Sequence, residues 1–172
     1  MTAMTELPVT REFGPRELRS ALGRYATGVT VITACAPGGR RIGVTANSFT
    51  SVSLEPPLVS WCPAKRAPSL PDLQQATHFA VNVLAADQHH LSGQFATGAP
   101  DKFAGVALAE GLGGVPLIEG ALVRFECRTV RWVDAGDHLI CLGEVERFDT
   151  GDGEPLVFHA GAYHVAARHP EF

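Results

Sequence analysis

Short apolar runs separated by glycine and proline dominate the hydrophobic pattern of this chain. Its 172 residues include 18 glycines and 12 prolines, which fall between the apolar runs. Runs of about four to eight apolar residues bounded by turn residues are typical of β-strands. The pattern predicts strands over residues 29–34, 42–45, 58–62, 79–84, 121–133, 139–148 and 156–159.

The two longest predicted strands indicate how a sheet would be covered. Residues 123–128 alternate between apolar and charged side chains, with Glu126 among the charged ones. This period of two is typical of a half-buried strand. The strand at 139–148 begins with a continuous apolar run, which predicts that its start is buried on both faces.

Helical spacing is confined to short segments. Pro15 opens the first of them, because its missing N–H costs nothing at a helix start. Leu18, Leu22 and Tyr25 follow at helical spacing and form one apolar stripe, and Gly28 ends the segment. Two further short helices are predicted over residues 70–76 and 87–95.

The order of these elements predicts one domain of mainly β structure. Residues 1–14 are polar and aperiodic, which indicates a flexible N-terminal arm, and residues 15–168 fit a single domain. Residues 98–120 are loop-rich. Many strands, few helices and no regular βαβ alternation favour an antiparallel barrel or sandwich with peripheral helices.

Composition and charge exclude several classes of protein. Hydrophobic residues make up 45% of the chain, charged residues 19%, and the formal net charge is -4. This balance argues against a nucleic-acid partner, which requires a basic surface. No apolar run approaches the roughly 18 residues of a membrane-spanning helix. The N-terminus has no basic stretch followed by an apolar one, so we expect a cytoplasmic protein with no membrane partner.

Familiar catalytic and metal-binding motifs are missing from the sequence. The four cysteines, at positions 35, 62, 127 and 141, form no C-x-x-C pair, and the seven histidines form no H-E-x-x-H. We therefore expect no metal site and reduced thiols. No G-x-G-x-x-G follows a strand, and neither a phosphate-binding loop nor a G-x-S-x-G elbow is present.

One uncharged polar stretch is a candidate binding segment. Six of the nine residues from Thr45 to Ser53 carry a hydroxyl or an amide, and none is charged. Such groups hold a neutral, planar, hydrogen-bonding ligand without the cost of burying a charge. A polar turn or a solvated edge strand explains the same composition, and composition alone favours that interpretation.

Three further segments are candidates for ligand binding, and each also has a purely structural interpretation. Lys65 and Arg66 follow a strand and precede Ser69. These residues could bind a phosphate, or the two cations could simply be solvated at the surface. Ser69 is also a candidate cap for the helix at 70–76. His138 follows Gly-Asp, so it faces a pocket or ends a hairpin turn. Tyr163, near the chain end, fits a lid that packs over the core.

In their order and spacing, these segments resemble the short-chain flavin reductase family, whose members have an FMN-binding split-barrel fold. The resemblance extends from about Leu18 to Tyr163, nearly the whole chain. Each segment is weak by itself, and the order of all of them carries the likeness. The matching segments are 25–33 (YATGVTVIT), 45–53 (TANSFTSVS), 56–58 (PPL), 79–84 (FAVNVL), 95–96 (FA), 101–103 (DKF), 136–138 (GDH) and 155–157 (PLV).

The resemblance implies an antiparallel, Greek-key-like split β-barrel that forms a homodimer. It implies an enzyme that transfers hydride from NADH or NADPH to FMN or FAD. The reduced flavin then diffuses to a separate flavin-dependent monooxygenase. By the same resemblance, the residues near the flavin ring and ribityl chain are Thr45, Ala46, Asn47 and Ser48, with Ser51, Val52 and Ser53 close by. Cys62, Lys65, Arg66 and Ser69 would lie towards the phosphate, His138 near the nicotinamide, and Tyr163 near the pocket mouth.

Hydride transfer of this kind requires no protein nucleophile or general base, which agrees with the missing motifs. The site has to stack the nicotinamide on the flavin at roughly 3–3.5 Å. Asn47, Ser48 and nearby backbone N–H groups are the candidate donors that stabilise the reduced flavin. Three alternatives stay open: a flavoprotein that retains its FMN and acts on another substrate, a non-catalytic flavin or haem carrier, and a structural dimer module.

Overall fold

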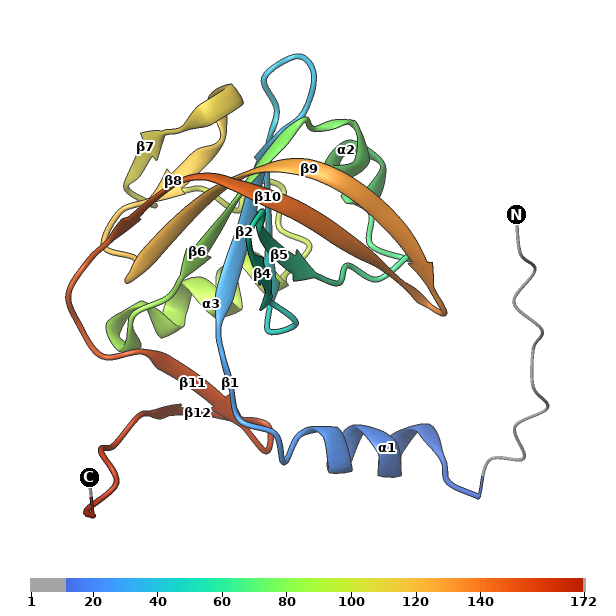
Figure 1. Ribbon diagram of the computed structural model, residues 1–172, viewed down its shortest axis with the longest axis vertical. Coiled ribbons are helices and arrows are strands. Elements are labelled where there is room, and N and C mark those ends of the chain that lie inside the picture. Colours follow the sequence, from blue (N-terminus) through green and yellow to red (C-terminus); the bar gives the residue numbers. More distant parts are fainter. Residues whose placement is uncertain (1–11, 172) are drawn as a thin grey trace.

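One antiparallel seven-stranded sheet forms the centre of the structure, a computed structural model that describes residues 12–171 (Figure 1). The strand order along the sheet is β3-β2-β6-β9-β10-β5-β4. The predicted N-terminal arm falls largely outside the described residues. The strands of this sheet are β2 (Thr30–Cys35), β3 (Arg41–Ala46), β4 (Thr50–Leu54), β5 (Pro57–Trp61), β6 (His78–Val83), β9 (Val123–Ala135) and β10 (His138–Thr150).

Short helices and two smaller sheets surround the main sheet. β1 (Thr27–Gly28), β11 (Leu156–His159) and β12 (Ala162–Val165) form a three-stranded sheet, and β7 (Leu108–Glu110) pairs with β8 (Pro116–Ile118). The helices are α1 (Pro15–Leu22), α2 (Leu70–Gln75) and α3 (His89–Ala96), with 3₁₀ turns η1 (Ala86–Gln88) and η2 (Leu112–Gly114). Within residues 12–171, no helix is long and apolar enough to cross a membrane.

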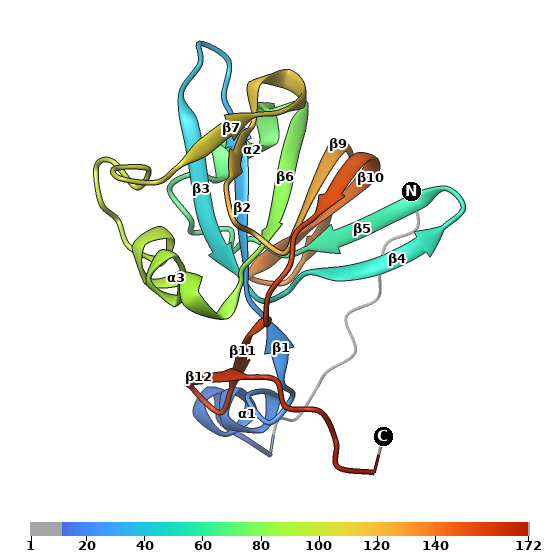
Figure 2. The ribbon, with the colours of Figure 1, turned by 90° about the vertical axis from the view of Figure 1, so that its left-hand side faces the viewer.

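The main sheet is curled because its two edge strands are neighbours in the chain. Only residues 47–49 separate β3 from β4, so this link brings the two edges of the sheet together (Figure 2). Among the described strands, β3 pairs only with β2 and β4 only with β5. The predicted mainly β, antiparallel fold with peripheral helices is confirmed, while strand pairing leaves the sheet open instead of closing it into a barrel.

The long β9–β10 hairpin extends beyond its neighbour β6. β6 pairs with β9 only over residues 123–128, whereas β10 pairs with β9 along its whole length. β10 also pairs with β5 from Cys141 to Glu144. Two register shifts, at Leu142/Gly143 and Val145/Arg147, bend the hairpin. Its tip therefore lies close to the end of β5, where the chain enters the 62–69 loop.

The core lies on both faces of the main sheet. Val31 and Ile32 are adjacent on β2 and both fully buried, and they belong to apolar clusters on opposite faces. The larger cluster contains Trp61, Phe79 and the thiol-bearing Cys127 and Cys141. Burial of a large apolar side chain contributes about 1.5–3 kcal/mol. The continuous apolar run at 29–34 reflects this two-sided burial.

Glu126 departs from the alternation that the sequence predicts for β9. Only 3% of its surface is exposed, because the segment around η2 covers this face of the sheet. The Leu112 N–H donates to its carboxylate at 2.6 Å, and the Arg147 guanidinium donates to both oxygens at 2.6 and 2.8 Å. Burial opposes ionisation, but these hydrogen bonds outweigh it and lower the pKa of Glu126.

Two other expectations are also corrected. Leu139 and Ile140, at the start of β10, are half-buried instead of buried on both faces, because this part of the hairpin projects past β6. The first helix ends at Leu22, with Gly23 as its C-cap, and does not continue towards Gly28. Tyr25 therefore lies outside the helix.

α1 and the small β1-β11-β12 sheet form a lower lobe that stands apart from the main sheet (Figure 1). No residue of α1 is buried. Leu22, Tyr25 and Val165 are 65%, 78% and 64% exposed. The predicted apolar stripe is thus present only in part: Leu18 and Leu22 lie on α1, Tyr25 follows it, and all three side chains are exposed.

Candidate functional site

A cavity of about 410 Å³ lies where the two edges of the main sheet meet. We call it the edge cavity. Its wall comes from the end of β3, the link to β4, the end of β5, the following loop, α2 and the tip of the β9–β10 hairpin. The lining residues are Val44, Thr45, Ala46, Asn47, Ser48, Trp61, Cys62, Pro63, Ala64, Ala67, Ser69, Leu73 and His138.

Ser48 joins two walls of the edge cavity. Its hydroxyl accepts a hydrogen bond from the Cys62 backbone N–H at 2.9 Å, and it lies 3.4 Å from the Cys62 carbonyl oxygen. The bond connects the β3–β4 link with the segment that follows β5, which are 14 residues apart in the chain. The side chain of Ser48 therefore fixes the width of the cavity at this point.

Backbone pairing brings His138 to the opposite wall. The Leu139 N–H donates to the Pro63 carbonyl at 3.0 Å, and the Lys65 N–H donates to the Asp137 carbonyl at 2.9 Å. Ala64 and His138 form an isolated β-bridge between these two bonds. The hairpin tip is thus held against the 62–69 loop, and His138 lines the cavity with 43% of its side chain exposed.

The edge cavity combines apolar walls with a few polar groups and carries no formally charged side chain apart from His138 when it is protonated. His138 Nδ1 lies 2.8 Å from an Asp137 carboxylate oxygen, and this hydrogen bond lowers the pKa of Asp137. Burial raises the pKa of the Cys62 thiol, with the Ser48 hydrogen bond opposing that shift. Cys62 thus enters the cavity wall as a neutral thiol.

Asn47 and Ser69 present polar groups with no partner among residues 12–171. Asn47 is exposed at the β3–β4 link, and no hydrogen bond engages its side-chain amide. Ser69 occupies the N-cap position of α2, but its hydroxyl makes no capping bond. The predicted capping role of Ser69 is therefore wrong. Both side chains remain available to a ligand.

Several predicted site residues lie outside the lining of the edge cavity. Lys65 and Arg66 are exposed on the adjoining loop, and the Lys65 ammonium pairs with Asp134 at 2.7 Å. The edge strand β4 carries three more, Ser51, Val52 and Ser53, of which the first two are exposed and Ser53 is half-buried. The structure thus brings together Thr45, Ala46, Asn47, Ser48, Cys62, Ser69 and His138.

Tyr163 lines a second, smaller cavity of about 210 Å³ that shares Thr45 and Asn47 with the edge cavity. Its hydroxyl donates to the Ser92 hydroxyl at 2.8 Å. The Thr45 hydroxyl donates to the Ser92 carbonyl at 2.7 Å. Ser92 therefore links Tyr163 to the β3 wall, and the polar stretch from Thr45 has a cavity on each side.

The sequence did not point to the apolar part of the lining. Trp61 is 1% exposed and Leu73 is 2% exposed, and both face the edge cavity from core positions. An apolar residue at a strand end or in a short helix carries no signal that separates cavity wall from core. Only the fold shows that these two residues border an open space.

The lining fits a planar, uncharged, hydrogen-bonding ring system. Ligand cavities for small molecules occupy about 300–1,000 Å³ and combine apolar walls with a few polar groups. The edge cavity has that size, apolar surface from Val44 and Leu73, and free polar groups on Asn47 and Ser69. The fold and the cavity together define a mainly β protein with a cavity suited to a small organic molecule between the edges of a curled sheet.

Comparison with known proteins gives the family. Residues 22–167 match the family described as flavin reductase like domain. The chain is 51% identical over 148 residues to FMN reductase (NADH) SmoA of Agrobacterium fabrum, covering 86% of this chain and 84% of that protein. It is 43% identical over 153 residues to the reductase component of a flavin-dependent trigonelline monooxygenase of Acinetobacter baylyi. That match covers 89% of this chain and 49% of the relative, so the chain spans about half of that longer protein.

A solved structure agrees with this match. The NADH:FAD oxidoreductase SgcE6 of Streptomyces globisporus is 38% identical and superposes with a TM-score of 0.86, covering 96% of this chain and 99% of that one. The chain therefore belongs to the flavin reductase like domain family.

Proposed function

We propose that this protein is an NAD(P)H:flavin oxidoreductase that takes up FMN or FAD in the edge cavity and releases it reduced to a partner monooxygenase. The names of its relatives support the activity, since they include an NADH-dependent FMN reductase and the reductase component of a monooxygenase. The observation that carries the proposal is the uncharged lining of the edge cavity, which combines apolar walls with short polar side chains. A ligand held without ion pairs exchanges readily.

The residues around the edge cavity fit a flavin. Thr45, Ala46, Asn47 and Ser48 offer backbone groups and short polar side chains along one wall. Flavin, when bound, supplies the redox chemistry by accepting a hydride from the nicotinamide. The free Asn47 amide and nearby backbone N–H groups favour the negative charge that reduction brings. The Ser69 hydroxyl, Lys65 and Arg66 lie on the side of the cavity that the family resemblance assigns to the flavin phosphate.

His138 is the proposed positioning residue for the nicotinamide. It lines the cavity from the hairpin tip, and its Nδ1 is engaged by Asp137, which fixes the orientation of the ring. The reaction needs no proton transfer from this side chain, so its role is to hold the pyridine ring flat. We expect His138→Ala to raise the KM for NADH several-fold while flavin affinity stays the same. Unchanged turnover and an unchanged KM for NADH would remove His138 from the site.

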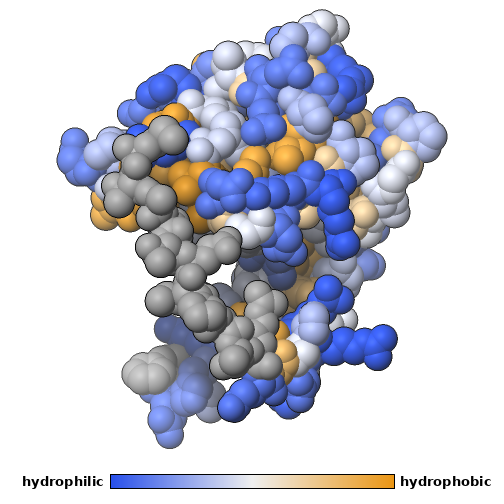
Figure 3. Space-filling view, turned by 90° about the vertical axis from the view of Figure 1, so that its right-hand side faces the viewer, coloured by the Kyte–Doolittle hydropathy of each residue, from blue (hydrophilic) through white to orange (hydrophobic). Residues whose placement is uncertain are grey.

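We further propose that the chain forms a homodimer, in which the curled sheet is the split barrel of the family. The exposed apolar side chains of the lower lobe, Leu22, Tyr25 and Val165, support a covered surface there. Apolar residues also appear on the body of the face drawn in Figure 3. Light scattering is expected to give twice the chain mass. A monomeric wild-type protein that still reduces flavin would refute the proposed dimer and leave the proposed activity standing.

A steady-state assay tests the proposed activity directly. The purified protein is mixed with NADH in air, and FMN or FAD is added below the NADH concentration. Continuous loss of NADH absorbance at a rate that rises with added flavin is the expected result. A yellow colour that survives dialysis without NADH oxidation would instead indicate a flavoprotein that retains its flavin or a non-catalytic carrier.

A further inference from the structure

A cavity of about 460 Å³ lies in the lower lobe, between α1 and the turn of the β11–β12 hairpin. We call it the arginine cavity. Figure 2 shows α1 directly below this hairpin. The lining residues are Arg16, Arg19, Ser20, Gly23, Arg24, Ala160 and Gly161. None of them lines the edge cavity or the smaller cavity beside it, so the arginine cavity is separate from the proposed flavin site.

The lining of the arginine cavity carries three positive charges and no negative one. Arg16, Arg19 and Arg24 are exposed, and the other four lining residues are uncharged. Within residues 12–171, no ion pair or hydrogen bond engages any of the three guanidinium groups. The carboxylate of Glu17, also on α1, accepts the Gly14 N–H at 2.8 Å instead. The described chain therefore leaves the charge of this cavity uncompensated.

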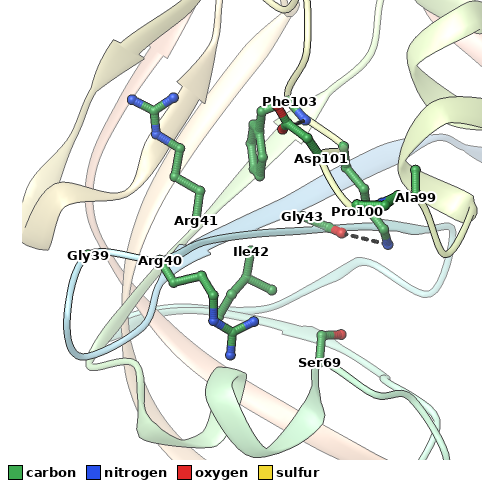
Figure 4. A pocket seen from close by; sticks show the side chains of 11 residues that line it. Gly39, Arg40, Arg41, Ile42, Gly43, Ser69, Ala99, Pro100, Asp101 and Phe103 are labelled. Atoms are coloured by element: carbon green, nitrogen blue, oxygen red, sulfur yellow. Dashed lines mark hydrogen bonds between the residues drawn. The ribbon is translucent and has the colours of Figure 1, made fainter.

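Two cations of another cavity, drawn in Figure 4, are engaged by groups of the chain itself. Arg40 forms an ion pair with Asp72 of α2. The Lys102 ammonium donates to the Gly43 carbonyl at 3.2 Å, the dashed line in Figure 4. The Asp101 carboxylate is part of the same lining. The arginines of the lower lobe have no contact of either kind, which sets them apart from these cations.

α1 carries its arginines and its leucines on different faces. Arg19 and Ser20 follow Arg16 by three and four residues, so their side chains share one face of the helix. Leu18 and Leu22 are also four residues apart and lie on the opposite side. The leucine face is the one that the proposed homodimer covers. The arginine face, turned to the β11–β12 hairpin, therefore stays open to a small ligand.

Few contacts hold α1 against the hairpin. No residue of α1 is buried, and a single backbone bond follows the helix, from the Ala160 N–H to the Gly23 carbonyl at 2.8 Å. Arg16 and Arg19 repel each other, because like charges at this helical spacing are neighbours. An anion between the three guanidinium groups removes that repulsion and connects α1 with the residues around the hairpin turn.

We infer that the arginine cavity binds a small anion with a diphosphate group, and that this anion fastens α1 to the β11–β12 hairpin. A guanidinium group donates two parallel N–H bonds to a phosphate, and three such groups match an anion of two or more charges. The volume of about 460 Å³ lies within the range of small-molecule sites. Inorganic diphosphate and the diphosphate of a free nucleotide share this chemistry, so either can be its source.

The test is calorimetric titration of the full chain with inorganic diphosphate and with ADP, at constant ionic strength. Arg16→Gln and Arg19→Gln are each expected to raise the Kd of diphosphate about tenfold, since each loses a charge-assisted hydrogen bond. Arg19→Lys keeps the charge but loses the paired N–H bonds, so its Kd falls between those of the wild-type protein and Arg19→Gln. The control is Arg131→Gln, which removes the same charge from an exposed position of β9 and is expected to change the Kd less than twofold.

Amide hydrogen exchange over residues 15–22 reports whether the anion fastens α1. Diphosphate at a hundredfold excess over its Kd should slow this exchange about a hundredfold in the wild-type protein, and much less in Arg19→Gln. A tighter Kd for ADP than for diphosphate would identify a nucleotide as the source, and equal values would identify inorganic diphosphate.

Three results would overturn the inference. The first is a wild-type protein that binds neither probe, as expected if carboxylates of a second copy already occupy the arginines. The second is an equal loss of affinity in Arg131→Gln, which would show general charge screening. The third is a raised KM for NADH or Kd for FMN in Arg16→Gln and Arg19→Gln, which would make the cavity part of the flavin site. A protein that binds diphosphate but reduces no flavin would overturn the proposed function alone.

Discussion

Replacement of Ser48 by alanine tests the geometry of the edge cavity most directly. The Ser48 hydroxyl accepts the Cys62 N–H at 2.9 Å and thereby joins the β3–β4 link to the loop after β5. Alanine removes this acceptor and little else, because the two side chains differ by one oxygen atom. The Cys62 N–H, in a half-buried segment, is left without its partner, and the two walls of the cavity are free to separate.

The size of the effect follows from one hydrogen bond. A hydrogen bond of this kind contributes about 0.5–1.5 kcal/mol to stability. For a chain of this length, a loss of about 1 kcal/mol lowers Tm by about 2–4 °C. If the same energy holds the cavity in its binding geometry, the Kd for FMN rises roughly twofold to tenfold. We therefore expect Ser48→Ala to change stability and flavin affinity together.

Ser51→Ala is the matched control for this measurement. Ser51 lies in the same polar stretch and loses the same atom, but it is exposed on β4 and does not line the cavity. Fluorescence titration with FMN and a thermal melt are run on both variants. We expect Ser51→Ala to bind FMN as the wild-type protein does. A larger effect at Ser51 than at Ser48 would place the flavin on the β4 surface and refute the edge cavity as its site.

Three further changes test the loop, the core thiols and the main sheet. Replacement of Lys65 and Arg66 together by alanine should weaken FMN much more than riboflavin, and equal weakening would show that neither cation binds the phosphate. Burial raises the pKa of Cys127 and Cys141 to about 12. The two buried neutral thiols stabilise the fold fully below the ordinary thiol pKa. This contribution is lost as the pH rises towards 12, because the thiols of the unfolded chain ionise at a lower pH than those of the folded chain. Above the ordinary thiol pKa, the free energy of unfolding measured with urea should therefore fall by about 1.4 kcal/mol per pH unit for each thiol. Replacement of both cysteines by alanine should reduce that slope. Gly143→Ala places a methyl group against a buried phenylalanine ring and should cost about 1–3 kcal/mol in urea unfolding, so a loss below about 0.5 kcal/mol would contradict this packing.

The strands with continuous apolar runs are the part of the fold that the sequence predicts well. Predicted strands at 29–34 and 79–84 match β2 and β6 within about one residue, because both strands are buried on two faces. The alternation in β9 predicts that Glu126 is exposed, and this prediction is wrong for a non-local reason. The segment that covers its face lies 14 residues away in the chain, and alternation within one strand carries no information about it.

Prediction of the site was limited by the same non-local pairing. The sequence predicts the polar stretch from Thr45 to Ser53 as one binding segment. In the structure it divides at the β3–β4 link into a part that lines the cavity and a part on the edge strand β4. His138 reaches the cavity because the hairpin tip pairs with the 62–69 loop, through its bridge to Ala64 and the two flanking backbone hydrogen bonds. Residue types alone select candidates of this kind, and pairing across the fold decides which of them meet.

The meeting of two sheet edges supports the proposal that a flavin is exchanged in the edge cavity and not retained. Edge strands leave backbone groups without strand partners, and those groups are free to bind a planar ligand through neutral hydrogen bonds. Each such bond contributes only about 0.5–1.5 kcal/mol, and no ion pair lies along the Thr45–Ser48 wall to add to them. The nearest cations of the predicted site, Lys65 and Arg66, lie outside this wall on the adjoining loop. Under the proposed function, the ring that accepts the hydride is thus held weakly enough to be released.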